Sequence, residues 1–193
     1  MTQITPIETL ESEHRTIMKV VNALGVLAEK LSDGEPVEGE TLQDVVAFMH
    51  VFADACHHGK EDELLFPALQ RKGVPSAGCP LGALRAEHVK GRTLIAKLEL
   101  LTEAYAKADP SATPLLVEMI GEIQKLYSNH IWKENFLAFP LVEKFLSFRE
   151  QLELQEQFDR VEADIGEGIH EKYVRMAEQL HERTLQTLVK SDN

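Results

Sequence analysis

Two His-x-x-x-Glu pairs recur in the sequence with a spacing that suits metal binding. His57 precedes Glu61 by four residues, and His130 precedes Glu134 by four residues. Residues four apart lie on one face of a helix, so both side chains of each pair point in the same direction. A carboxylate on the inward face of a helix is costly unless it is paired or bound to a metal ion. The two pairs therefore predict a buried cation site.

The pairs belong to an internal repeat. Residues 10–14 match residues 84–88 as LxxEH, at an offset of 74, and residues 57–67 match residues 130–140 as HxxKExxLxFP, at an offset of 73. Because the two offsets agree to one residue, the repeat covers a whole helical hairpin and predicts approximate two-fold symmetry. The repeated polar residues that face the core form the predicted ligand set: His14, His57, Glu61, His88, His130 and Glu134.

Six ligands in two equivalent halves predict two metal ions. Two carboxylates facing each other across a core would repel unless cations lay between them, so we expect Glu61 and Glu134 to bridge the ions. Imidazole with carboxylate suits iron, and also manganese or zinc, and no thiolate is placed to compete. This ligand count leaves open positions on six-coordinate iron for water or dioxygen.

The elements that must position these residues are helices. Apolar residues three and four apart form four long segments, separated by proline- and glycine-containing breaks near residues 33–36, 72–80 and 109–114. No stretch alternates with the period of a strand. We predict an all-α, up-down-up-down four-helix bundle over residues 1–148, followed by a C-terminal helical extension over residues 149–193.

The extension carries an apolar stripe that must be covered by the bundle or by a second copy of the chain, which would give a homodimer. The stripe consists of Ile169, Tyr173, Met176, Leu180 and Leu188.

Composition excludes several classes of protein. The 193-residue chain has a formal net charge of −12 and no basic block, which disfavours nucleic acid and anionic membranes as partners. No apolar run reaches the roughly 18 residues of a membrane span, and the N-terminus lacks the features of a signal peptide. Two cysteines are too few for a disulfide scaffold. We therefore expect a cytoplasmic protein.

The chain resembles the haemerythrin-like family, the HHE cation-binding domains, over about residues 7–148. The resemblance rests on the six ligands named above and on the Phe-Pro that follows each His-x-x-x-Glu. It implies a four-helix bundle with a non-haem di-iron site, associated with oxygen binding, oxygen or iron sensing, or iron–sulfur repair. Oxygen-carrying haemerythrins use five histidines, two of them four apart on one helix. Here Arg92 follows His88 at that spacing, so a seventh ligand is missing.

The expected function is to bind or sense oxygen or a related small oxidant. The missing ligand favours reactivity over carriage, so the first alternative is a di-iron enzyme: an oxidase, a peroxidase or an iron–sulfur repair factor. The second alternative is a zinc-loaded structural or signalling module.

The remaining histidines are not predicted to be ligands. His58 lies about 100° around the helix from His57 and has Ile131 as its repeat partner, so we interpret it as a flanking residue. We interpret His50 as a core or network histidine, and His170 and His181 as solvated histidines.

Five further residues lie near the predicted ligands. We expect Cys56 to be a small buried side chain, Tyr127 to pack in the core rather than act as an oxidisable phenol, and Glu13 and Glu87 to be solvated. Gly91, one turn after His88, leaves room for a small ligand or for close packing against Trp132 or Phe136.

Overall fold

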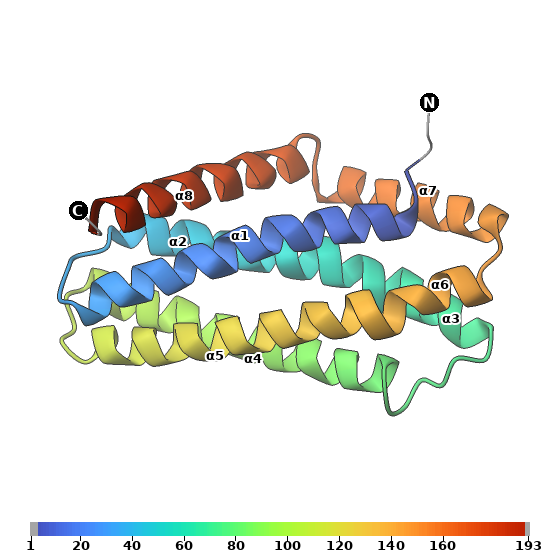
Figure 1. The fold of residues 1–193 in the computed structure, drawn as a ribbon, viewed down its shortest axis with the longest axis horizontal. Helices are drawn as coiled ribbons and strands as arrows, with labels where there is room; N and C mark the ends of the chain where they lie inside the picture. The colour runs from blue at the N-terminus through green and yellow to red at the C-terminus, as the bar shows by residue number, and fades with distance from the viewer. Residues whose placement is uncertain (1–3, 192–193) are drawn as a thin grey trace.

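The computed structural model describes residues 4–191, with side chains described as far as residue 186, and these residues form helices and no strand. The all-helical bundle predicted from the hydrophobic periodicity is thus confirmed. The helices are α1 (Pro6–Ser32), α2 (Gly39–Phe48), α3 (Phe66–Arg71), α4 (Leu81–Ala106), α5 (Ala112–Lys133), α6 (Phe139–Phe145), α7 (Phe148–Ile165) and α8 (Ile169–Ser191). Figure 1 shows the long helices side by side along the longest axis of the molecule. No helix in the described part of the chain is long and apolar enough to cross a membrane.

Local sequence signals fix where the helices begin. Thr5 caps α1 by accepting a hydrogen bond from the Glu8 amide, while the Glu8 side chain accepts one from the Thr5 amide, and Pro6 follows at the first helical position. Ser147 and Glu150 form the same reciprocal arrangement at the start of α7. Between α7 and α8 the backbone turns at Gly166, whose φ of 133° favours glycine.

Three π-helical segments interrupt the helices that carry the His-x-x-x-Glu pairs, where the sequence predicted continuous α-helices. They are η1 (Met49–His58), η2 (Glu61–Leu65) and η3 (Glu134–Ala138). At the end of η2 the Phe66 amide donates to the carbonyl of Glu61, five residues back, and Phe139 does the same to Glu134 at the end of η3. A proline, which has no amide hydrogen to donate, follows each of these phenylalanines. The repeated Phe-Pro thus closes a widened turn that starts at each glutamate.

The core consists of two apolar clusters. The larger one includes Ile17, Phe52 and Leu94, and the smaller one includes Leu10 and Leu84. Along α1 and α4 the predicted ligand histidine lies in sequence between residues of the two clusters. The predicted ligand histidines of α1 and α4 therefore lie between two clusters of packed apolar side chains.

The extension packs on the bundle of its own chain. Helix α8 lies along α1 in Figure 1, and Tyr173, Ala177 and Leu180 are buried in the larger apolar cluster. Ile169 and Met176 pack against the same cluster. The side chain of Leu188 lies outside the described residues. The described part of the stripe is thus covered by the bundle of its own chain, including α1 and Phe48 of α2.

Candidate metal centre

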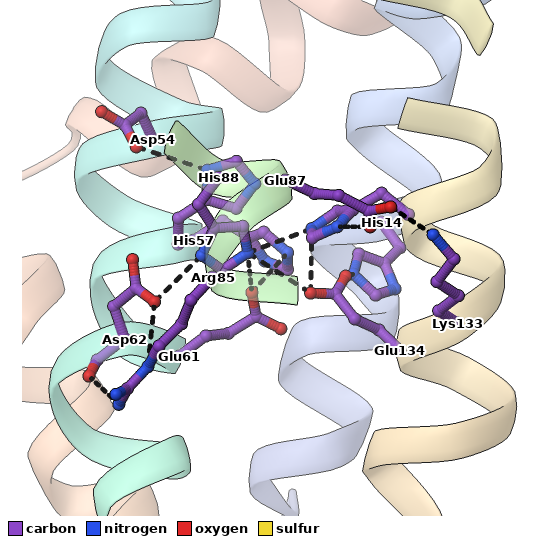
Figure 2. A network of polar contacts seen from close by, with 12 residues as sticks. His14, Asp54, His57, Glu61, Asp62, Arg85, Glu87, His88, Lys133 and Glu134 are labelled. Carbon is purple, nitrogen blue, oxygen red and sulfur yellow. Dashed lines mark hydrogen bonds and ion pairs between the residues drawn. The ribbon is translucent and has the colours of Figure 1, made fainter. Parts of the chain in front are cut away.

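All six predicted ligands meet in the interior of the bundle. Each is at most 3% exposed. One group of ligand atoms belongs to His14, His57, Glu61 and Glu134, and a second to Glu61, His88, His130 and Glu134; within each group the atoms lie within 4.8 Å of one another. Figure 2 labels five of these side chains, which converge from different helices: His14, His57, Glu61, His88 and Glu134. Because Glu61 and Glu134 belong to both groups, they have the placement of bridging carboxylates.

The two oxygens of Glu134 face different histidines. Oε2 lies 3.0 Å from Nε2 of His14, and Oε1 lies 2.9 Å from Nε2 of His130. Glu61 approaches both halves through one oxygen, with Oε2 3.7 Å from Nε2 of His57 and 3.4 Å from Nε2 of His88. Glu134 Oε1 also lies 3.5 Å from Nε2 of His88, so each carboxylate reaches at least one histidine from each half of the repeat.

Most of these converging atoms meet as ion pairs rather than as well-formed hydrogen bonds. Both oxygens of Glu61, both oxygens of Glu134 and Nε2 of His14 and His57 are buried and make no hydrogen bond of good geometry among the described residues. Nε2 of His88 and His130 point at each other across 3.1 Å. Buried polar atoms normally make well-formed hydrogen bonds, so a buried set in which most of the atoms converge without one fits a place for cations.

The outward-facing nitrogen of each histidine is held by an oxygen. Nδ1 of His57 lies 3.0 Å from Glu13, and Nδ1 of His130 lies 3.1 Å from Glu87. The remaining two are held across the repeat, His14 by Asn135 at 2.8 Å and His88 by Asp62 at 3.0 Å. Such contacts fix the ring and turn its other nitrogen toward the centre of the cluster. Because Asp62 and Asn135 are repeat partners, the pseudo-symmetry extends to this outer layer.

The prediction that Glu13 and Glu87 are solvated is wrong. Glu13 is 2% exposed and accepts from Lys60 as well as contacting His57. Glu87 contacts His130 and accepts from Lys133 in the same way. The glutamate of LxxEH therefore positions the histidine of HxxKE, and the lysine of HxxKE holds that glutamate.

Sequence reasoning missed His58, which lies inside the cluster rather than beside it. A ligand atom of His58 lies within 4.8 Å of ligand atoms of His88 and His130. Its ring stacks on His88 with centroids 4.0 Å apart, and its Nδ1 lies 3.3 Å from Asp54. The angular argument against His58 assumed an α-helix, but the preceding residues are π-helical, and a π-helix turns through less angle per residue.

Arg92, at the spacing where a seventh ligand was sought, has another role. Its guanidinium donates to Asp54 at 2.8 Å and to Asp62 at 3.0 Å. These two carboxylates hold the outer nitrogens of His58 and His88. Arg92 therefore orients the aspartates behind two of the histidines.

Protons partly neutralise the site when it holds no metal. Burial lowers the pKa of His130, but the charge of Glu134 outweighs it and raises the pKa to about 9. Burial likewise lowers the pKa of His88, but Asp62, Glu134 and Glu61 raise it to about 11. For His58, burial and the nearby His88 both lower the pKa well below its usual range, so this ring is neutral at pH 7.

The three histidines outside the cluster differ in their exposure and in their contacts. His50 is not in the core: its side chain is exposed and lies 3.2 Å from Glu99. His170 was expected to be solvated, but it is only partly exposed. Its Nε2 lies 3.3 Å from Glu13, and its ring contacts Phe52. His181 is partly buried on α8.

Cys56 and Tyr127 are buried as expected. Burial raises the pKa of the Cys56 thiol to about 12, so the sulfur stays protonated, and it lies 3.9 Å from Glu13. Tyr127 packs in the larger apolar cluster, with its ring 6.1 Å from that of His58.

Gly91 faces Tyr127 and Leu126, not Trp132 or Phe136, which are exposed. A Cβ on Gly91 would meet the Tyr127 hydroxyl at 3.6 Å and Leu126 at 3.8 Å, which is ordinary contact. The crevice beside it, bounded by His58 and His130 among others, is too narrow for a water molecule. The glycine thus makes close packing rather than an open channel.

We expect Gly91→Ala to fit and to raise the free energy of unfolding by up to about 1 kcal/mol, because alanine favours the helix. Gly91→Val adds two further carbons against Tyr127 and should lower the melting temperature and the metal content together. Thermal unfolding and metal analysis of the two variants check this. A valine variant that keeps both its stability and its metal would show that open space lies beside Gly91.

Comparison with known proteins agrees with the site. Residues 5–142 match the hemerythrin HHE cation binding domain family. Similar curated proteins include uncharacterised proteins of Mycobacterium bovis and Mycobacterium tuberculosis, which are 22% identical over 156 residues. The aligned part is 81% of this chain and 60% of those relatives, so the chain covers about three fifths of their length.

Proposed function

Because the chain belongs to the hemerythrin HHE cation-binding family, we propose that it is a di-iron protein that binds or senses oxygen or a related small oxidant. One observation carries this proposal: buried imidazole nitrogens and carboxylate oxygens converge in two groups that share both carboxylates, and most of these atoms make no well-formed hydrogen bond. Imidazole and carboxylate together suit iron. The up-down-up-down order of the four bundle helices and a cytoplasmic location are parts of the same proposal.

The proposed ligand set has seven members. His58, His88 and His130 would hold one ion, and His14 and His57 would hold the other. Glu61 and Glu134 would contribute to both. His58 supplies the fifth histidine that the spacing on α4 does not provide, which supports oxygen binding over the enzymatic alternative.

The protein residues orient and insulate the ions. Glu13, Asp62 and Glu87 hold the outer nitrogens of ligand histidines, so each ring presents its Nε2 inward. Phe66 and Phe139 stack against His88 and His14, with ring centroids 5.9 and 5.3 Å apart, and exclude water from that side. When bound, an iron pair would supply one-electron redox chemistry and an exchangeable position for a small ligand. We expect that position on the side of His14 and His57, which has fewer histidines.

Metal binding is expected to release protons at neutral pH. The raised pKa values of His88, about 11, and His130, about 9, mean that this pair of rings holds an extra proton at pH 7 without metal, shared across the 3.1 Å between their Nε2 atoms. The bound proton stabilises the folded apo protein, and this contribution is complete below pH 6.5, the ordinary pKa of histidine. For His130 the contribution is lost as the pH rises through about 9. The increase in melting temperature on metal binding should therefore grow between pH 6.5 and 9.

Calorimetry of Zn²⁺ or anaerobic Fe²⁺ binding in two buffers of different ionisation enthalpy measures the released protons. We expect proton release at pH 7 that declines by pH 9. Binding without proton release at pH 7 would mean that the histidines are already neutral.

The functional proposal is tested by optical spectroscopy of the iron-loaded protein. We expect a charge-transfer band that disappears on reduction and returns in air over repeated cycles. Loss of the band with turnover of peroxide would favour the enzymatic alternative, and a colourless zinc-loaded protein would favour the structural one.

A further inference from the structure

We propose that the C-terminal extension positions the His57 half of the metal centre, through Glu162 on α7 and His170 on α8. This inference rests on the proposed metal binding and adds two residues that lie beyond the family match at residues 5–142. Among the described contacts, neither residue touches a predicted ligand directly. Both act through Glu13 and Lys60.

The contacts form a continuous chain from the extension to His57. Glu162 accepts from the Lys60 ammonium at 2.5 Å, and the same ammonium donates to Glu13 at 2.5 Å. His170 lies 3.3 Å from Oε1 of Glu13. The other Glu13 oxygen, Oε2, lies 3.0 Å from Nδ1 of His57. One carboxylate oxygen of Glu13 thus faces the extension and the other holds the ligand ring.

Burial makes this chain sensitive to the extension. Lys60 is fully buried and Glu13 is 2% exposed, so neither charge can exchange its partner for water. Glu162 and His170 are partly exposed, with 28% and 27% of their side chains accessible. They line a groove of about 900 Å³ between α1 and the extension. The extension therefore closes a buried charged network that the bundle alone leaves open.

The internal repeat provides a matched comparison. Glu87 and Lys133 are the repeat partners of Glu13 and Lys60, and they hold His130 in the same way. Their side chains are 21% and 31% exposed, and the extension supplies no contact to them among those described. The pseudo-symmetric centre is therefore asymmetric in its outer layer: bundle and extension hold His57, and the bundle alone holds His130.

The test compares the two ions in the full-length protein loaded with iron. We expect Glu162→Ala and His170→Ala to make one of the two ions leave to a ferrous chelator about tenfold faster, the effect typical of residues that orient a ligand. The other ion should leave at the wild-type rate. Glu162→Gln, which keeps an oxygen for Lys60, should have a smaller effect.

Two variants serve as controls. Glu178→Gln removes an ion pair between α8 and Lys19 of α1 that does not touch Glu13, so it reports on docking of the extension alone. It should leave both release rates unchanged. Lys133→Ala should speed the release of the other ion. The Mössbauer spectrum reports on the surroundings of each iron ion and is insensitive to looser packing of the extension. The signal of one of the two iron sites should change in Glu162→Ala, and neither signal should change in Glu178→Gln.

The outcomes separate this inference from the proposed function. A wild-type protein that binds fewer than two ions would reject the proposed function itself. A wild-type protein that binds two ions, with Glu162→Ala and His170→Ala variants that release both at the wild-type rate, would overturn only the role of the extension. Equal acceleration of both ions, or the same effect in Glu178→Gln, would overturn the assignment to His57.

Discussion

Replacement of Glu134 by alanine is expected to remove both metal ions from the protein. Glu134 belongs to both ligand groups, and its two oxygens face His14 and His130 at 3.0 and 2.9 Å. Without it each ion loses a ligand and the two ions lose a shared anion that offsets their mutual repulsion. Metal content should fall from two ions per chain to almost none, and the melting temperature to that of the metal-free protein or below.

Controls distinguish this effect from a loss of folding. Glu134→Gln keeps the shape but not the charge and should also lose most of the metal. Glu99→Ala removes a glutamate from an exposed histidine–glutamate pair, with His50, and should change neither metal content nor stability. Metal content is measured by elemental analysis and folding by circular dichroism. A well-folded Glu134→Ala protein with two ions would show that this carboxylate does not bridge them.

Replacement of His58 by alanine is expected to remove one ion and leave the other. The His58 ring is buried, neutral at pH 7 and grouped with His88 and His130, so it needs no deprotonation before it binds a cation. The ion served by His14 and His57 does not depend on it. We therefore expect about one ion per chain after exposure to a chelator.

Comparison with the symmetric ligands makes this test specific. His57→Ala and His130→Ala, at equivalent positions of the repeat, should each lower metal content by a similar amount. His50→Ala, an exposed histidine on the same helical segment, should have no effect. If His58→Ala keeps both ions as tightly as the wild type, the centre has six protein ligands and His58 only packs against it.

The repeat explains why much of the site could be predicted. A polar residue that recurs at the same position of two amphipathic helices must be useful inside the bundle, and His14 with His88 and His57 with His130 met that condition. The same reasoning could have found Glu13 and Glu87. Both are repeated at the offset of their neighbouring histidines.

His58 could not be found in this way. It breaks the repeat, because its partner position is Ile131, and its inward orientation depends on π-helical backbone that hydrophobic periodicity does not reveal. The Phe-Pro after each glutamate signals the widened turns η2 and η3, since a proline in a helix demands a local change of backbone, but it does not signal η1, where His58 lies.

The sequence also could not predict where the C-terminal extension packs. An amphipathic stripe shows that a helix must cover something but not what it covers. The contacts of Glu162 and His170 depend on where α7 and α8 lie against α1. No spacing within the extension predicts them.

Elemental analysis of the full-length protein, purified from its native host without added metal, tests the central claim most directly. We predict two iron ions per chain, bound tightly enough to survive gel filtration. Zinc as the sole bound metal, or fewer than one iron per chain in protein that cannot be loaded with Fe²⁺ afterwards, would contradict a di-iron centre at these seven residues.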